Sequence, residues 1–472
     1  MSRRYNYLLK NIGLLTLSNF GSKILVFLMV PLYTSVLSTS DYGTYDLFNT
    51  TISLLIPIIS INISEGVLRF ALDEKNDSSI VYSIGWNIII KGFLVVVLGI
   101  IFNNIFNIFP LLKENSITFL LLYLSTIVYQ FLSSFIRGID KVSILSIAAI
   151  LNTISILGFN ILFLIIIPLG LAGYFWSNIL GLVLPSLYLI YKISQYNIKY
   201  TSLQNKKLQQ RLVSYSIPLI LNSLGWWINN AIDRYVVIAF CGVAVNGIYS
   251  VGYKIPSILN IFANIFNQAW ILSSVKSYRD EDSEYFFSQV YNKYNMIMVL
   301  ISGLLISCSK ILAKFLYMNE FYDAWKFVPF LLIANVFGAI SGFAGGIFSA
   351  VKDSKIYSQS TLVGAIVNII FTFVFVYYYG AIGAAIATMI SYFVVWIIRV
   401  HTMRKYIKLK IFIRRDVFSY VLLIFQSIVL WLENSYVLYP IQVVLFLLLV
   451  MLFYKEIKSI IGELKKFLTQ EP

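Results

Sequence analysis

Polar and charged side chains recur at helical spacing inside some of the most apolar segments of this chain. In segment 245–270, one helical face carries Lys254, Ser257, Asn260, Asn264 and Gln268. Residues three and four apart lie on the same face of a helix. Ionisable groups in apolar surroundings are unfavourable unless they contact protein, water or a ligand. This pattern therefore predicts a polar surface that receives a charged ligand.

Similar polar faces occur in three other apolar segments. Segment 12–36 carries Asn19, Ser22 and Lys23 near its middle. Segment 44–66 carries a stripe of Asp46, Thr50, Ser53, Ser60 and Ser64. Segment 212–240 carries Asn222, Trp226, Asn229 and Asp233, with Asn230 and Arg234 one position further round. We expect these four faces to line one water-filled central cavity.

The charges in these faces favour an anionic ligand. Lys23 lies near mid-segment, too deep to reach either membrane surface easily. We predict that Lys23 and Lys254 both face the cavity. Arg234 follows Asp233 directly, so their side chains point about 100° apart on a helix. The sequence leaves open whether they face the same surface or different surfaces. Asp46 and Asp233 are the candidates for ion coupling. For single Ser and Asn residues, hydrogen bonding between helices is the simpler interpretation.

The apolar segments themselves predict a polytopic membrane protein. A run of roughly 20 apolar residues crosses a bilayer as a helix, and about fourteen such runs follow one another here. They lie at 12–36, 44–66, 83–109, 116–136, 143–167, 171–191, 212–240, 245–270, 291–317, 325–350, 358–379, 383–403, 416–433 and 436–454. The predicted fold class is therefore all-α.

The basic residues predict the orientation of these spans. The chain has 36 Lys and Arg against 21 Asp and Glu, a formal charge of +15. Most Lys and Arg lie at both ends and in alternate gaps such as 192–211, whereas the gaps 37–43, 168–170, 241–244 and 380–382 have none. Basic residues in short loops stay on the cytoplasmic side. Both termini are therefore predicted to be cytoplasmic, and this topological use of charge argues against nucleic-acid binding.

Short patterns recur at nearly one offset and predict two similar lobes. Gly43-Thr44-Tyr45 matches Gly247-Ile248-Tyr249, and Gly170-Leu171-Ala172-Gly173 matches Gly380-Ala381-Ile382-Gly383. Asp140-Lys141 and Asp353-Ser354-Lys355 fall in matching gaps. A repeat of this kind occurs in transporters whose halves are related by an axis along the membrane normal. We predict an N-lobe at 1–191, a linker at 192–211, a C-lobe at 212–403, and two further spans and a cytoplasmic tail at 404–472.

The sequence has no pattern typical of covalent chemistry. There is no metal-ligand spacing, no nucleotide-binding Gly-rich motif, no nucleophile elbow and no pair of carboxylates on an outer loop. The lone His401 lies in a basic gap, where it is expected to be solvated. We therefore predict that the protein is not an enzyme and uses no metal and no other cofactor.

Several runs of residues resemble one known family. They are LLTLSNFGSKILVFLMVPLYTSVLSTSDYGTYDL near the start, ISEGVLRFALD after it, IDRYVVIAFCGVAVNGIYSVGYKIPSIL in the second half, and NQAW. Through them the chain resembles the Wzx-type polysaccharide flippases, whose superfamily also holds multidrug extruders and peptidoglycan-precursor flippases. The resemblance extends over nearly the whole chain. It implies fourteen helices, arranged as two six-helix lobes and two extra helices.

The resemblance also implies a function and partners. Its members move an undecaprenyl-pyrophosphate-linked oligosaccharide across the bacterial cytoplasmic membrane, for O-antigen, capsule or exopolysaccharide synthesis. Cations on the cavity helices are a feature of related flippases, and the matching positions here are Lys23, Arg234 and Lys254. Asn19, Asn229, Asn260, Asn264 and Trp226 are then expected to meet the sugars. Expected partners are the lipid-linked substrate, membrane lipid, and the polymerase and chain-length proteins of the same pathway.

Two other functions remain open from the sequence. A cation-coupled multidrug antiporter on the same fold predicts an acidic, apolar cavity with a titrating Asp, and the excess of cations argues against it. A polysaccharide polymerase or lipid-dependent glycosyltransferase needs a sizeable outer loop with catalytic charges, and the outer gaps here are short and bare.

Overall fold

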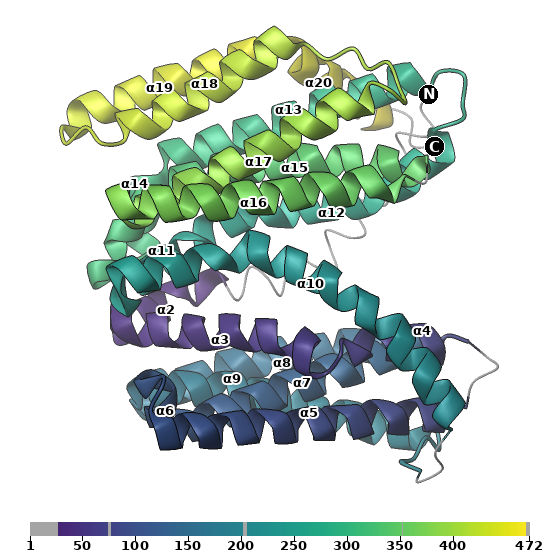
Figure 1. The fold of residues 1–472 in the computed structure, drawn as a ribbon. Helices are drawn as coiled ribbons and strands as arrows, with labels where there is room; N and C mark the ends of the chain where they lie inside the picture. The colour runs from purple at the N-terminus through teal and green to yellow at the C-terminus, as the bar shows by residue number, and fades with distance from the viewer. Residues whose placement is uncertain (1–26, 74–76, 202–204, 352, 469–472) are drawn as a thin grey trace. The chain divides into compact units, whose positions relative to one another are not determined.

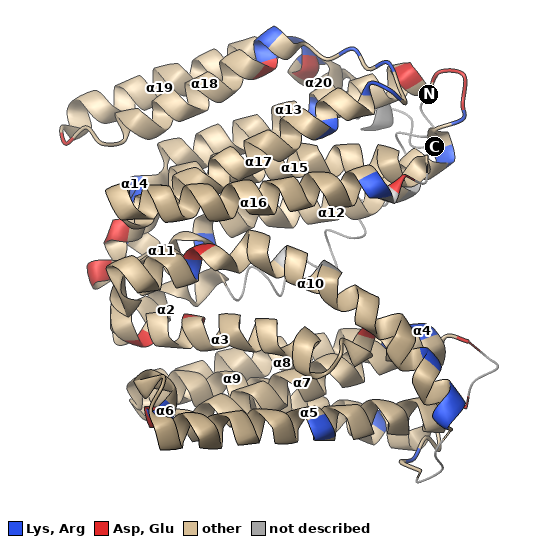
Figure 2. Ribbon diagram, in the orientation of Figure 1, with Lys and Arg blue, Asp and Glu red and all other residues tan. Residues whose placement is uncertain are grey.

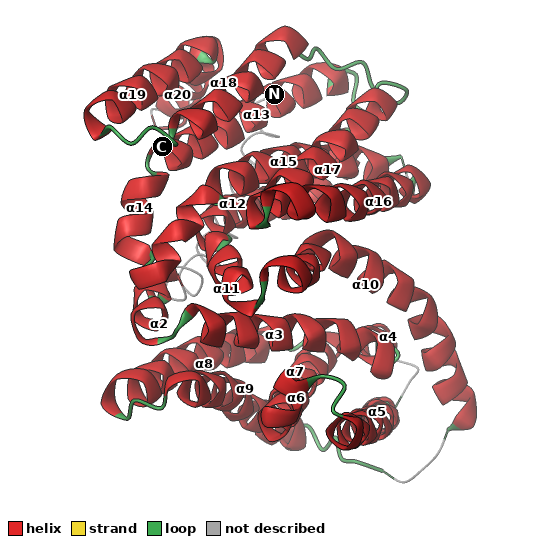
Figure 3. Cartoon of the chain, turned by 60° about the vertical axis from the view of Figure 1, so that its left-hand side comes forward, coloured by secondary structure: helices red, strands yellow, loops and turns green. Residues whose placement is uncertain are grey.

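The structure is a computed structural model that describes residues 27–73, 77–201, 205–351 and 353–468. Throughout these residues the regular elements are helices, joined mostly by short loops (Figure 3). Helices follow from the composition, because each backbone N–H and C=O in hydrocarbon needs an internal hydrogen-bond partner and a helix supplies it. The predicted all-α membrane fold is therefore confirmed.

The described residues form two compact units, and the chain passes from one to the other between Ile232 and Asp233, inside α10. The N-unit, up to Ile232, contains α2 (Val30–Val36), α3 (Thr39–Ile59), α4 (Ile63–Ala71), α5 (Ser78–Phe106), α6 (Pro110–Glu114), α7 (Ser116–Gly138), α8 (Val142–Asn160), the π-helix η1 (Ile161–Ile166), α9 (Gly170–Gln195) and the first part of α10 (Lys206–Cys241). These helices are purple to teal in Figure 1.

The C-unit begins at Asp233 and includes the end of α10. It continues with α11 (Val243–Gly252), α12 (Lys254–Ser277), α13 (Ser283–Ser307), α14 (Ser309–Leu316), the 3-10 helix η2 (Asn319–Lys326), α15 (Val328–Ala350), α16 (Ser354–Tyr379), α17 (Ala381–Met403), α18 (Ile413–Val429), α19 (Ser435–Leu452) and α20 (Tyr454–Leu468). Figure 2 shows that charged residues in the described chain gather mostly near the ends of these helices.

Ten described helices are long and apolar enough to cross a membrane, and the bent pair α3–α4 is an eleventh. The predicted spans 12–36, 212–240 and 416–433 are not among them. The first lies mostly outside the described residues, the second lies within the longer helix α10, and the third corresponds to α18, which is 17 residues long. The total of about fourteen spans therefore stays a prediction.

Three predicted spans are interrupted or shifted. Segment 44–66 starts earlier, at Thr39, and bends by 58° between α3 and α4, where Ile61 and Asn62 take left-handed backbone conformations. Segment 245–270 is divided at Tyr253 into α11 and α12. Segment 291–317 is divided at Cys308 into α13 and α14. Hydropathy does not place such breaks, because each segment is apolar on average although polar residues such as Lys254 and Ser309 stand beside the break.

The second repeated pattern has the same local structure in both units. Gly170 and Gly380 have positive φ angles of 56° and 62° and directly open α9 and α17. Gly173 and Gly383 lie one turn later, against the backbone of the preceding helix of the hairpin. The turns at Asp140-Lys141 and Asp353-Ser354-Lys355 do not share a backbone conformation, because Asp140 has a φ of 57° and Asp353 a φ of −100°.

Gly383 allows α17 to lie very close to α16, and this predicts a large effect of adding one methyl group. A Cβ at Gly383 would lie 2.2 Å from the carbonyl oxygen of Phe375. Gly383→Ala should therefore lower the free energy of unfolding by about 1–3 kcal/mol, as overpacked cores do. Thermal unfolding in detergent measures this. Gly99→Ala is the matched control, because no atom lies within 4 Å of a Cβ there; equal destabilisation by both variants would contradict the prediction.

A buried arginine joins three helices of the C-unit near the end of α17. Arg399 is 5% exposed and lies 4.0 Å from the ring centre of Tyr357. It donates hydrogen bonds to Ser360 Oγ, to Thr361 Oγ1 and to the carbonyls of Ser341 and Tyr357. Arg399 therefore joins α15, α16 and α17 as a packing residue.

Asp353 and Tyr406 connect the start of α16 to the loop after α17. The Tyr406 hydroxyl donates to the Asp353 carboxylate at 2.6 Å and lowers the pKa of that carboxyl below its usual value. A lowered folded-state pKa stabilises the fold above the unfolded pKa of about 3.9, and this contribution disappears as pH falls through the folded value. The melting temperatures of wild type and Tyr406→Phe should therefore differ at pH 7 and converge at acid pH. Tyr278→Phe removes a hydrogen bond to the Tyr406 carbonyl and should change the melting temperature equally at both pH values; a constant difference for Tyr406→Phe would contradict the prediction.

Candidate functional site

The break between α11 and α12 places two tyrosines around one carboxylate in the C-unit. Asp233, on α10, is 3% exposed, and its Oδ2 atom accepts hydrogen bonds from the hydroxyls of Tyr249 and Tyr253, both at 2.6 Å. The two hydroxyls lie 3.1 Å apart. The other carboxylate oxygen accepts from the backbone N–H of Arg234 at 3.0 Å. A buried carboxylate requires such donors, and here three of them fix its position.

The tyrosines are held by the local backbone. Tyr249 and Tyr253 are four residues apart, so both project from one face, and α11 ends between them at Gly252. The ring of Tyr249 packs edge-on against Phe327 at 5.4 Å. Tyr253 stands at the break itself, and its carbonyl accepts the N–H of Ser257 in the first turn of α12. The hydroxyl groups of both tyrosines therefore point towards Asp233 at this break.

Two of the predicted cations adjoin this cluster. The Arg234 guanidinium lies 5.3 Å from the ring centre of Tyr253, and Lys254 is the next residue after Tyr253. Both side chains are half-buried. We name Asp233, Arg234, Tyr249, Tyr253 and Lys254 the C-unit cluster; it contains one carboxylate and two cations and is formally positive.

The remaining predicted residues of the C-unit lie along α12. Asn260 and Asn264 are both exposed within the structure and are four residues apart, so they share one face. Gln268 continues the same face and is also exposed. Asn260, Asn264 and Gln268 therefore form an exposed polar face of α12, and its use as a binding surface stays a prediction.

Two predicted residues belong to the N-unit instead. Asp46, on α3, is 8% exposed. The ring centres of its neighbour Tyr45 and of Tyr174 on α9 lie 4.5 Å apart. Tyr45 donates to Asn178 at 2.9 Å. Asn229 donates to the carbonyl of Gly225 within α10. This bond lies within α10, so it does not test the interpretation that single Asn residues join neighbouring helices.

Asn19 and Lys23 lie outside the described residues, and the side chain of Trp226 is not described. Its neighbour Trp227 donates to the backbone carbonyl of Thr50 at 3.0 Å and so joins α10 to α3. The sequence reasoning missed Tyr249 and Tyr253. Their spacing of four on the stripe-bearing segment was a usable signal, but aromatic residues are so common here, with 33 tyrosines, that spacing alone did not distinguish them.

The comparisons with known proteins agree with this architecture. Residues 8–271 match the family described as polysaccharide biosynthesis protein. A probable low-salt glycan biosynthesis flippase of Haloferax volcanii is 21% identical over 240 residues, which is 50% of each chain, so the match spans half the length of that relative.

Solved structures show the same fold. The lipid II flippase MurJ in an inward closed conformation superposes with a TM-score of 0.70 and 16% identity, covering 95% of this chain and 99% of that one. An inward-facing multidrug transporter of the MATE family, in the MOP superfamily, gives a TM-score of 0.69 at 13% identity, covering 81% and 95%. The family match extends over more than half of the residues, and the predicted resemblance is confirmed: this chain belongs to the polysaccharide biosynthesis protein family and has the fold of the MOP-superfamily flippases and exporters.

Proposed function

We propose that this protein flips an undecaprenyl-pyrophosphate-linked oligosaccharide across the cytoplasmic membrane, to supply O-antigen, capsule or exopolysaccharide synthesis. The observation that carries the proposal is the formally positive C-unit cluster in a member of a polysaccharide biosynthesis family. A pyrophosphate is an anion with several acceptor oxygens, and Arg and Lys are the side chains that bind such groups best.

The buried carboxylate shapes this site without neutralising it. Asp233 accepts two phenol hydroxyls and a backbone N–H, and these donors fix its position; Arg234 is its neighbour in sequence, and Lys254 is the neighbour of Tyr253. Arg234 and Lys254 then supply the positive charge for the pyrophosphate, with Lys23 as a third cation. Asn260 and Asn264 extend along α12 and offer amide groups to the sugars.

Alternating access of the two lobes would carry the headgroup across while the lipid tail stays in the bilayer. A negative interior potential favours outward movement of an anion, by roughly 2.3 kcal/mol per charge per 100 mV. Asp46 and Asp233 are the residues through which an ion gradient could contribute. Both termini lie in the cytoplasm in this proposal, and a polysaccharide polymerase and chain-length proteins use the product.

Deletion of the gene is the first test of the proposal. We expect loss of surface polysaccharide and accumulation of unpolymerised lipid-linked repeat units on the cytoplasmic side, measured by lipid extraction and glycan staining. Normal glycan with altered drug sensitivity would indicate a multidrug antiporter instead. Repeat units that reach the outer leaflet but stay unpolymerised would indicate an enzyme.

The charge mechanism is tested by complementing the deletion with variants. Lys23→Ala combined with Lys254→Ala should abolish glycan export at normal protein levels, because two cations of the headgroup site are lost. Lys276→Ala, at the other end of α12, is the matched control and should restore export. Full export by the double variant would show that these cations do not bind the substrate.

A further inference from the structure

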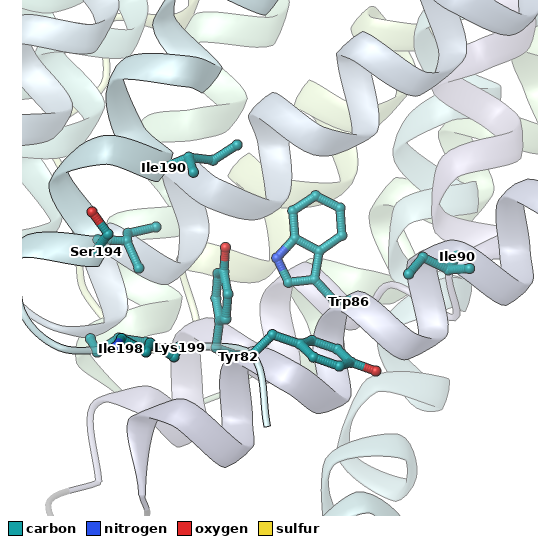
Figure 4. A pocket seen from close by; sticks show the side chains of 9 residues that line it. Tyr82, Trp86, Ile90, Ile190, Ser194, Ile198 and Lys199 are labelled. Carbon is teal, nitrogen blue, oxygen red and sulfur yellow. The ribbon is translucent and has the colours of Figure 1, made fainter. Parts of the chain in front are cut away.

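An open pocket of about 630 Å³ lies in the N-unit, on helices other than those of the C-unit cluster. Its walls are α5, the end of α9 and the segment that follows α9 (Figure 4). The lining side chains are Tyr82, Trp86, Ile90, Ile190, Ile193, Ser194, Ile198, Lys199 and Tyr200. They are mostly aromatic or aliphatic, one is a lysine, and none is acidic.

The segment 196–201 closes one side of this pocket because it is tied to α5. The Tyr200 hydroxyl donates to Asn87 Oδ1 at 2.7 Å, and the backbone N–H of Thr201 donates to Ser83 Oγ at 2.8 Å. At the other end of the segment, the ammonium group of Lys141 lies 5.0 Å from the ring centre of Tyr196. This part of the predicted linker between the lobes is thus a wall of the pocket.

The pocket opens onto apolar helix faces. Trp86, Ile90, Leu94 and Leu98 form a stripe along one i, i+4 ridge of α5, and Leu94 and Leu98 are 56% and 65% exposed. On α9, Leu187 and Ile190 are likewise exposed. Exposed stripes of this kind on membrane-spanning helices contact lipid. The apolar end of the pocket is therefore continuous with the lipid-facing surface.

The other end of the pocket has the chemistry of a membrane interface. Lys199 lines it, and Tyr82, Trp86 and Tyr200 are residue types that gather at the headgroup level. Lys192 lies over the rings of Tyr188 and Tyr191 on the same end of α9. Basic residues beside a membrane span attract anionic headgroups.

We propose that this pocket is a binding site for one anionic phospholipid of the leaflet on the linker side. An acyl chain lies along the stripe from Trp86 to Leu98, and the phosphate contacts Lys199. Because segment 196–201 leads from α9 towards α10, bound lipid holds this part of the linker against α5. The site takes a structural lipid and does not depend on the substrate proposed above.

Native mass spectrometry of the full-length protein tests the site with phosphatidylglycerol and phosphatidylcholine of identical acyl chains. Wild type should retain phosphatidylglycerol preferentially, and Lys199→Gln should reduce that preference about fivefold, the effect of one juxtamembrane lysine. Lys207→Gln, an exposed lysine on α10 outside the pocket, is the matched control and should keep the preference. Equal retention of both lipids by wild type, or equal losses in the two variants, would overturn the proposal.

A second pair of variants separates a pocket from diffuse charge attraction. Ser194→Trp keeps every cation but fills the pocket, so it should abolish phosphatidylglycerol retention, whereas Ser194→Ala should not. Brominated phosphatidylglycerol should also quench tryptophan fluorescence less in Trp86→Phe than in wild type. Glycerol phosphate, which has no acyl chain, should not displace the lipid. Unchanged retention in Ser194→Trp, or displacement by glycerol phosphate, would show that no acyl-chain site exists here.

Discussion

Asp233→Ala should both destabilise the protein and abolish glycan export. The Asp233 carboxylate accepts the hydroxyls of Tyr249 and Tyr253, and its removal leaves the buried Tyr249 and the half-buried Tyr253 without this acceptor. Each buried polar group that loses its partner costs about 1–3 kcal/mol. The melting temperature in detergent should fall, and the deletion strain should not regain surface polysaccharide.

Asp233→Asn separates the charge from the hydrogen bonds. The asparagine carbonyl has the same position and can still accept both phenols, so this variant should keep most of the stability. It removes the negative charge beside Arg234 and Lys254, however, and makes the C-unit cluster more positive. If the carboxylate couples transport to an ion, the variant should fold normally but export little polysaccharide. Export at the wild-type rate would show that Asp233 only orders the site.

Phenylalanine substitutions provide the reciprocal test. Tyr249→Phe and Tyr253→Phe each remove one donor to Asp233, and the two hydroxyls also lie within hydrogen-bond distance of each other. Groups in one network are not independent. The double variant should therefore lose a different amount of stability from the sum of the single variants, and strict additivity would indicate that the three groups do not act as one unit.

The fold was predictable from the sequence because bilayer thickness imposes a length on each apolar run. The breaks were less predictable, since Tyr253 and Cys308 stand within runs that are apolar on average. The structure shows what hydropathy omits: Asn62 takes a left-handed conformation at the bend after α3, and its side chain donates to Ser223 on α10. A tertiary contact of this kind leaves no periodic signal.

The site was predictable in part for a similar reason. Helical spacing placed Asn260 and Asn264 on one face of α12, because that spacing is a property of one helix, and their part in binding stays a prediction. The pairing of Asp233 with Tyr249 and Tyr253 joins different helices, and it depends on where α11 ends. Basic residues are ambiguous in the same way: the sequence does not distinguish a Lys or Arg that marks topology from Arg399, which is buried, or Arg415, which is 13% exposed, and both contact neighbouring helices.

Arg415→Ala should produce the largest loss of stability in the C-unit. Arg415 lies on α18, and its side chain is 13% exposed. It forms ion pairs with Asp416 and with Glu456 on α20, and it donates a hydrogen bond to Asn292 on α13. The side chain of Asp416 is fully buried, and that of Glu456 is 12% exposed. Removing one partner of buried ion pairs leaves uncompensated charge, which costs about 3–5 kcal/mol.

The same variant should release α20 before the rest of the unit unfolds. The guanidinium also packs against the rings of Phe412 and Phe453, so both charge and packing are lost at the start of α20. Hydrogen exchange over 454–463 should accelerate in Arg415→Ala, whereas exchange in α15 should not change. Arg415→Lys should restore only part of the stability that Arg415→Ala loses, because an ammonium group lacks the planar guanidinium that contacts several acceptors together.

Lys326→Ala is the control that makes this prediction specific to burial. Lys326 pairs with Asp323 at 2.8 Å in η2, but the two side chains are 31% and 55% exposed. Exposed pairs contribute about 0–1 kcal/mol, so this variant should unfold within a few degrees of wild type. A double variant of Arg415→Ala with Glu456→Gln should recover part of the loss, because it removes one of the two carboxylates left without a cation. If it recovered nothing, the destabilisation would come from lost packing against Phe412 and Phe453, and the ion pairs would contribute little to holding α20 on α18.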